Sequence, residues 1–259
     1  MALAPLPTQL NRALRSRRAA CSQAPPGLLT SFTGSPVENH GVEAALMEEV
    51  KSFVYRHYDE HLEKKFYASD LAKNLHLNKD DGAELLAGCI STNLGLAGAA
   101  GVVDAFAPPF VGTKFAMYPP CPRPDLVWGL RAHTDAGGII LLLQDDAVGG
   151  LEFHRGGREW VPVGPTRRGR LFVNIGDQVE VLSGGAYKSV VHRVAAGAEG
   201  RRLSVATFYN PGPDAVIAPA TAAAPYPGPY RYGDYLDYYQ GTKFGDKAAR
   251  FQAVKKLFS

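Results

Sequence analysis

The strongest constraint on the fold is a series of short runs of β-branched and aromatic residues that begins at Gly112. The clearest runs occupy residues 139–143, 171–175, 189–194 and 203–209. Glycine pairs, and a corner formed by Asn210, Pro211 and Gly212, separate them at the spacing expected of an antiparallel sandwich or barrel. We therefore predict an α+β, mainly β fold whose core is a double-stranded β-helix, or jelly roll.

Helical patterns lie on both sides of this core, because apolar residues there recur every three or four positions. The predicted helices span residues 42 to about 66, 83–96, 232–240 and 247–258. The second follows the turn-like residues 80–82. In the third, Tyr235, Tyr238 and Tyr239 share one face, which favours aromatic packing against the edge of the core over ligand binding. We expect these helices to pack on the sheets.

The chain divides into four parts by composition. They are an atypical or disordered tail (1–37), a truncated helical region (38–106), the jelly-roll domain (107–218) and a C-terminal helical segment that closes the site (219–259). The tail holds four arginines and no acid, so the net charge of +3 leaves −1 for the remainder. The same composition also fits an organellar transit peptide for a plastid or mitochondrion, which is the alternative for this segment.

Composition excludes several classes of protein. The basic excess is confined to the tail, so no nucleic-acid partner is implied. The apolar runs near the termini are far shorter than the roughly 20 residues of a membrane-spanning helix. Three scattered cysteines, Cys21, Cys89 and Cys121, predict no disulfide framework and favour a cytoplasmic location. We expect a folded, soluble protein, with a monomer favoured.

Three side chains have the pattern of metal ligands. His133 and Asp135 fall on the same face if their segment is a strand, so both can reach one ion. His192 lies in a β-branched run that would otherwise bury a polar ring. Two histidines and one carboxylate leave coordination positions open, as in non-haem Fe(II) oxygenases. An isolated His-x-Asp pair is weak evidence by itself, so the surrounding residues matter.

Ten residues after His192, Arg202 and Ser204 would point to the same side of another predicted strand. A guanidinium and a hydroxyl placed in this way suit a carboxylate or another small oxyanion. Such charge-assisted hydrogen bonds contribute roughly 1.5 to 3 kcal/mol each. The pattern thus predicts an anion site beside the metal site.

Several motifs, in order along the chain, resemble those of plant 1-aminocyclopropane-1-carboxylate (ACC) oxidases, within the Fe(II)/2-oxoglutarate-dependent dioxygenase superfamily. They are His133-Thr134-Asp135-Ala136-Gly137-Gly138, Asn174-Ile175-Gly176-Asp177-Gln178, Lys188-Ser189-Val190, His192-Arg193-Val194, Arg202-Leu203-Ser204 and Phe208-Tyr209-Asn210-Pro211-Gly212. Features shared more narrowly with ACC oxidases are Gly112-Thr113-Lys114, Tyr118-Pro119-Pro120-Cys121-Pro122, Arg131 and Lys247-Ala248-Ala249-Arg250. The resemblance covers roughly residues 38 to 259.

The resemblance implies oxidation of ACC to ethylene, carbon dioxide and cyanide with O2 and ascorbate. It implies that His133, Asp135 and His192 bind Fe(II). The cofactor-binding residues implied are Arg202, Ser204 and Tyr118, which would hold bicarbonate or the substrate carboxylate, since this subgroup does not use 2-oxoglutarate. The catalytic residues implied, in activation by bicarbonate and ascorbate, are Lys114, Arg131, Lys247 and Arg250. Strand parity predicts in addition that Arg131 points inward.

The chain departs from the family pattern twice. An unrelated arginine-rich segment precedes Glu38-Asn39-His40-Gly41, where members carry a strand and a helix. A second segment, containing a tryptophan in other members, is missing near residue 82. Losing edge strands would expose unpaired backbone groups, so we predict lower stability than an intact member has. Equal melting temperatures of this chain and a version with both segments restored would contradict that prediction.

Three alternatives remain open at this point. Residues 57–61 match the His-x-x-Glu-His pattern of a zinc peptidase class, although a solvated helix surface explains the pattern better. A different 2-oxoglutarate oxygenase, acting on a hormone or flavonoid, shares the ligand triad. A non-catalytic truncated paralogue is the third alternative. Replacing His57 and His61, which should leave iron binding unchanged, tests the first alternative. Assays of ACC turnover with and without 2-oxoglutarate test the second, and metal analysis together with turnover tests the third.

Overall fold

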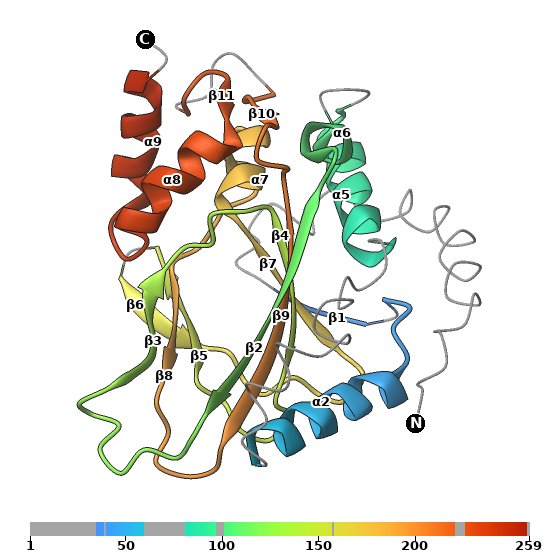
Figure 1. Ribbon diagram of the computed structural model, residues 1–259, viewed down its shortest axis with the longest axis vertical. Coiled ribbons are helices and arrows are strands. Elements are labelled where there is room, and N and C mark those ends of the chain that lie inside the picture. Colours follow the sequence, from blue (N-terminus) through green and yellow to red (C-terminus); the bar gives the residue numbers. More distant parts are fainter. Residues whose placement is uncertain are drawn as a thin grey trace.

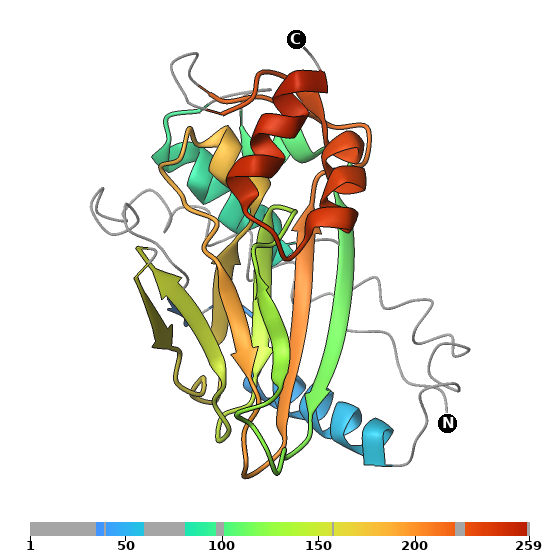
Figure 2. The ribbon, with the colours of Figure 1, turned by 90° about the vertical axis from the view of Figure 1, so that its left-hand side faces the viewer.

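The computed structural model describes residues 35–38, 40–59, 81–96, 101–156, 158–220 and 226–257 (Figure 1). Two antiparallel sheets form the centre of this part of the chain, in agreement with the predicted mainly β fold and jelly-roll core. Helices gather at one end of the sheets, and a single longer helix crosses the opposite end (Figure 2). The hydrophobic core therefore lies between the two sheets and where the helices pack against them.

The larger sheet has the strand order β1-β7-β4-β9-β2. Its strands are β1 (Ser35–Val37), β2 (Phe110–Tyr118), β4 (Ile139–Gln144), β7 (Leu171–Ile175) and β9 (Arg202–Asn210). All five residues of β7 are buried, which explains why its sequence is continuously apolar apart from Asn174 instead of alternating. The predicted runs at 139–143, 171–175 and 203–209 thus correspond to three adjacent strands.

The smaller sheet has the order β3-β8-β5-β6. Its strands are β3 (Trp128–His133), β5 (Leu151–Arg155), β6 (Glu159–Pro162) and β8 (His192–Ala195). The run predicted over residues 189–194 is strand only from His192 onward. The register between β3 and β8 shifts between Leu130 and His133, so the alternation of side chains is interrupted there. That irregularity decides the orientation of Arg131, described below.

Each predicted helical region contains a helix, and the structure adds two short helices that were not predicted. The helices are α2 (Ala44–Asp59), α5 (Asp81–Asn93), α6 (Val102–Phe106), α7 (Asp177–Leu182), α8 (Tyr232–Thr242) and α9 (Lys247–Leu257), and two short strands, β10 (Val216–Ile217) and β11 (Tyr230–Arg231), pair with each other. Residue 81 begins a helix and is not part of a turn. The short helix α7 was not predicted. All six of its residues are buried, including the polar ones, so its sequence lacks the alternation of apolar and polar positions that indicates a helix at a surface. In α8, Tyr235 and Tyr239 are buried whereas Tyr238 is exposed, so the predicted shared face is wrong for Tyr238.

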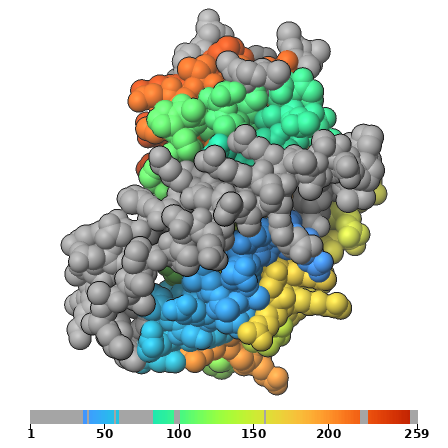
Figure 3. Space-filling model, turned by 90° about the vertical axis from the view of Figure 1, so that its right-hand side faces the viewer, coloured from blue at the N-terminus to red at the C-terminus, as the bar shows by residue number. Residues whose placement is uncertain are grey.

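The helix α2 covers one end of the larger sheet. Its residues Met47 and Val54 form a buried cluster with Leu143, Leu171 and Leu203, from three strands of that sheet. In Figure 3, α2, in blue, lies beside yellow and orange segments from much later in the sequence. The amphipathic pattern of residues 44–59 favours a helix locally, whereas contacts with strands far along the chain fix the position of that helix.

The predicted tail is not entirely separate from the fold. Ser35–Val37 forms β1, which pairs antiparallel with β7 at the edge of the larger sheet. Pro36 is tolerated there because an edge strand needs fewer backbone donors. Residues 1–34, which hold most of the proposed transit signal, lie outside the described residues. In the zinc-peptidase pattern, residues 60 and 61 and the side chain of His57 lie outside the described part of the chain as well.

Two further sequence predictions concern the cysteines and membrane association. Cys121 is a free thiol, whereas Cys89 is disulfide-bonded, so Cys89 departs from the reduced state expected of scattered cysteines, although one bond is not a disulfide framework. Within the described segments, the helices are too short or too polar to cross a bilayer.

Candidate metal centre

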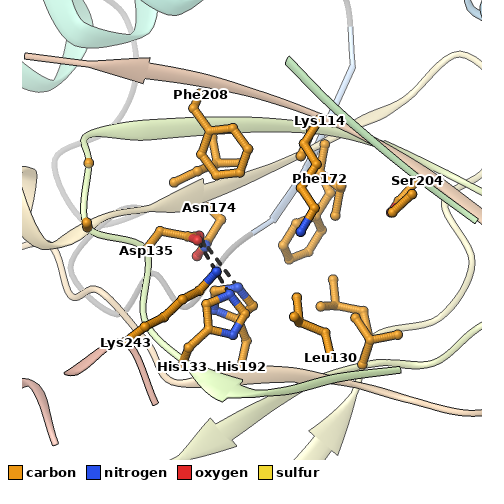
Figure 4. A pocket seen from close by; sticks show the side chains of 18 of the residues that line it. Lys114, Leu130, His133, Asp135, Phe172, Asn174, His192, Ser204, Phe208 and Lys243 are labelled. Atoms are coloured by element: carbon orange, nitrogen blue, oxygen red, sulfur yellow. Dashed lines mark hydrogen bonds and ion pairs between the residues drawn. The ribbon is translucent and has the colours of Figure 1, made fainter. Parts of the chain in front are cut away.

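A cavity of about 230 Å³ lies between the two sheets. Its walls include apolar side chains from both sheets, among them Leu130, Phe172 and Val194. Polar groups converge at one end, where His133, Asp135 and His192 meet (Figure 4). A small, largely apolar cavity with a few convergent polar groups is the usual form of a small-molecule site.

The three predicted ligands come together as a compact set. One potential ligand atom from each of His133, Asp135 and His192 lies within 4.8 Å of the others, and all three residues are buried. The Nε2 atoms of His133 and His192 are 3.7 and 3.5 Å from the carboxylate oxygens of Asp135. The residues come from β3, the loop that follows it, and β8, where His133 and His192 are register partners.

Neighbouring groups orient these ligands. The Nδ1 atoms of His133 and His192 lie 2.8 and 3.1 Å from the carbonyl oxygens of Arg131 and Val190, so each Nδ1–H can donate and each Nε2 stays free for a metal. The amide of Asn174 donates to Asp135 at 2.7 Å. Burial and the nearby His192 lower the pKa of His133 to about 4, so its ring is neutral near pH 7. These features fit a divalent metal held by two imidazoles and one carboxylate.

Glycines allow the backbone to pack tightly around the ligand-bearing loop. A Cβ on Gly176 would lie 2.3 Å from the carbonyl oxygen of Gly137, and one on Gly138 would lie 2.0 Å from the ring of Phe106. The amide of Gly176 donates to the carbonyl of Gly138 at 2.6 Å. Residues 174–178 thus form the support on which the loop 133–138 rests.

Replacing Gly176 with alanine is expected to lower the free energy of unfolding by about 1 to 3 kcal/mol or more, because backbone must move to admit the methyl group. The matched control is Gly88→Ala in α5, where an added Cβ meets nothing within 4 Å. That change is expected to raise stability by up to about 1 kcal/mol, because alanine favours helix. Chemical denaturation of both variants measures the contrast, and a neutral Gly176→Ala variant would contradict the tight-packing argument.

Arg202 and Ser204 lie side by side on β9, both buried and both lining the cavity, as strand alternation predicts. One nitrogen of Arg202, Nη2, donates to Gln144 at 3.0 Å. Its Nε and Nη1 atoms are buried without a hydrogen-bond partner. Burial lowers the pKa of Arg202, although arginine remains charged near pH 7. Because buried charged donors are costly to leave unpaired, these two nitrogens indicate a site for an anion.

Tyr118, the third residue predicted to bind a cofactor, lines the same cavity, with the centre of its ring 5.3 Å from the guanidinium of Arg202.

Among the four basic residues assigned catalytic roles by resemblance, Lys114 lines the cavity. Arg131 does not: it is exposed, and its guanidinium lies 4.4 Å from the ring centre of Phe244. The prediction that Arg131 points inward is therefore wrong, because the register shift in β3 places both Leu130 and His133 on the inner side. Simple alternation cannot anticipate such a shift.

Lys247 and Arg250, on α9, do not line the cavity either. The ammonium of Lys247 is 2.6 Å from the carboxylate of Glu180 and also bonds the carbonyl of Ser189. Arg250 is completely buried among polar groups behind the ligand-bearing loop. Neither residue is placed to touch a ligand in the cavity, so any role in the reaction is indirect.

Sequence reasoning missed four residues of the site. Gln144 and Asn174 hold Arg202 and Asp135, respectively. Lys243 enters the cavity from the end of α8, and its pKa is lowered by burial and by the charge of Lys114. Tyr232 lines the cavity from the start of the same helix. The signal for Asn174 was available, since it is the polar residue within an apolar strand; the others depend on contacts between distant segments.

A jelly roll that encloses a His-Asp-His set beside an arginine and a serine defines the class of mononuclear non-haem Fe(II) oxygenases. Consistent with this class, residues 109–211 match the model of the 2OG-Fe(II) oxygenase superfamily. A crystal structure described as JOX2 in complex with 2OG, Fe and JA is similar, with a TM-score of 0.70 and 25% identity over 93% of this chain and 85% of that chain.

Curated relatives narrow the assignment. ACC oxidase 1 of Arabidopsis thaliana is 45% identical in an alignment of 265 positions that covers 85% of this chain and 84% of that protein. ACC oxidase 1 of Oryza sativa subsp. japonica is 42% identical in an alignment of 276 positions that also covers 85% of this chain and 84% of that protein. The chain therefore belongs to the ACC oxidase family.

Proposed function

We propose that this protein oxidises ACC to ethylene, carbon dioxide and hydrogen cyanide at Fe(II). The balanced reaction consumes one O2 and one ascorbate, and it yields two water molecules and dehydroascorbate. Two electrons come from ACC and two from ascorbate. Membership of the ACC oxidase family and the buried His-Asp-His set together support this function.

The observation that carries the proposal is the pairing of a metal centre with an anion site inside one small cavity. A volume of about 230 Å³ lies below the roughly 300 to 1,000 Å³ of pockets for drug-sized ligands, so it suits a small amino acid. The unpaired donors of Arg202 lie in the same cavity as the ligand set. A substrate that chelates the metal and a small oxyanion such as bicarbonate can then be held together.

Each part of the cavity has a distinct task. His133, Asp135 and His192 would hold Fe(II), which when bound supplies the redox chemistry with O2. Arg202 and Ser204 would hold bicarbonate or a carboxylate. Lys114 and Lys243 add positive charge to the cavity, which favours entry of anions such as ascorbate. The apolar walls exclude water, which strengthens these electrostatic interactions.

Ethylene in the headspace is the direct test of this function. The purified chain, supplied with ACC, Fe(II), ascorbate and bicarbonate but no 2-oxoglutarate, is expected to release ethylene. Omitting ascorbate or bicarbonate is expected to reduce the rate. Strict dependence on 2-oxoglutarate would instead identify another oxygenase of the superfamily. Metal binding without turnover of either kind would identify a non-catalytic relative.

A further inference from the structure

Thr134, between the ligands His133 and Asp135, is held by side chains from three helices. Its hydroxyl donates to the carboxylate of Asp177 at 3.1 Å and accepts a hydrogen bond from Nη2 of Arg250. Its carbonyl oxygen accepts from the hydroxyl of Tyr239 at 2.7 Å. The threonine is 2% exposed, so water does not compete with these contacts. The segment carrying two of the three ligands is thus anchored to α7, α8 and α9.

Asp177 and Arg250 form the centre of this anchor. Both residues have an exposure of 0%, and Nη2 of Arg250 lies 3.4 Å from the Asp177 carboxylate. Tyr235 donates to Asp177 at 2.6 Å and accepts from Nε of Arg250 at 3.2 Å. The backbone amide of Asp177 also donates to the carbonyl of Asp135 at 2.8 Å. Asp177 therefore holds the ligand-bearing loop by side chain and backbone.

This arrangement is not what stability alone would favour. Burying two charged groups costs several kcal/mol in lost hydration, and well-packed apolar residues often stabilise a fold as well or better. The remaining nitrogen of Arg250, Nη1, bonds the carbonyl oxygens of Thr242 and Gly245, both at 3.1 Å, at the junction of α8 and α9. Arg250 therefore links the C-terminal helices to the loop that carries the ligands.

We propose that Asp177 and Arg250 are positioning residues of the metal centre, which set the placement of His133 and Asp135 through Thr134. The proposal rests on the proposed Fe(II) site. It gives Arg250, which does not line the cavity, an indirect role at the metal centre. It also makes docking of α9 and metal binding reciprocal: the docked helix raises metal affinity, and the bound metal stabilises the docked helix.

Lys247 provides a matched control on the same helix. It also pairs with a buried acid, Glu180, but its contacts reach Ser189 and not the loop 133–138. Loss of Lys247 should therefore weaken the packing of α9 without displacing Thr134. A comparison of Arg250 with Lys247 separates a specific effect on the metal centre from a general effect of α9 on stability.

The test measures Co(II) affinity and the visible Co(II) spectrum by anaerobic titration, with the melting temperature of the metal-free protein as a third readout. Arg250→Met and Thr134→Val are each expected to weaken Co(II) binding by about 10- to 100-fold, the usual cost of losing an outer-shell partner. Both are also expected to alter the spectrum. Thr134→Ser, which keeps the hydroxyl, is expected to stay within about threefold of the wild type. Lys247→Met is expected to melt earlier but to bind Co(II) within about twofold of the wild type.

The double variant of Arg250 and Thr134 tests whether both act along one path. Its loss of affinity is expected to be smaller than the product of the two single losses, because the residues share one contact. Hydrogen exchange of the α9 amides is expected to slow when Co(II) is added. Wild-type affinity in Thr134→Val, an equal loss in Lys247→Met, or unchanged exchange in α9 would overturn the proposal. A chain that binds Co(II) but releases no ethylene contradicts only the proposed function, whereas a chain that binds no Co(II) contradicts both.

Discussion

Asp135→Asn is expected to lose Fe(II) binding and ethylene release together while keeping its fold. Asparagine has nearly the same shape, and its side-chain oxygen can still accept the hydrogen bond that Asn174 donates to Asp135. The variant lacks the anionic ligand, so the metal would be held by two imidazoles and at most a weakly coordinating amide oxygen. We expect the affinity for Fe(II) to fall by more than the roughly 10- to 100-fold that loss of an outer-shell partner causes. Metal titration and headspace ethylene measure the two losses.

Asp145→Asn is the matched control for Asp135→Asn. Asp145 is also buried, but it bonds Tyr55 and the backbone amides of Ala147 and Val148, away from the metal ligands. Its replacement is expected to reduce stability and to leave Fe(II) binding intact. If Asp135→Asn kept wild-type affinity for Fe(II), or if Asp145→Asn lost it, the assignment of the ligand set would be wrong.

Arg202→Met is expected to show the second large effect, a fall in ethylene release of about 100- to 10,000-fold. The size follows from two charge-assisted hydrogen bonds of roughly 1.5 to 3 kcal/mol each, donated by Nε and Nη1 to the bound anion. The melting temperature of the metal-free protein is expected to change little. Removing two unpaired buried donors offsets the loss of the hydrogen bond to Gln144.

The control for this second prediction is Arg193→Met. Arg193 lies on β8 next to His192, but its guanidinium lies 4.2 and 4.0 Å from the ring centres of Trp128 and Trp160 and pairs with Glu152. Its loss is expected to lower the melting temperature without changing the dependence of the rate on bicarbonate. Equal rates and equal bicarbonate dependence in Arg202→Met and the wild type would contradict the anion site.

The local pattern of the sequence was sufficient for the three adjacent strands at the centre of the larger sheet. The strands at 139–144, 171–175 and 202–210 follow from apolar runs and turns, which act over a few residues. The buried pair Arg202 and Ser204 followed from alternation along one regular strand. Two predictions failed because tertiary contacts outweighed the local pattern. The register shift between β3 and β8 turns Arg131 outward, and the polar residues of α7 are buried although their sequence suggests exposure.

The sequence by itself determined which side chains could bind a metal, because two histidines and an acid carry their ligand chemistry in any fold. It did not determine how they are held. The contacts that fix Thr134 join it to Asp177, Tyr239 and Arg250, which lie 43, 105 and 116 residues further along the chain. Such contacts exist only after the helices dock on the sheets. Tertiary structure therefore decided that Lys114, Lys243 and Arg202 line the cavity, whereas Arg250 contacts the loop that carries the metal ligands from the side away from the cavity.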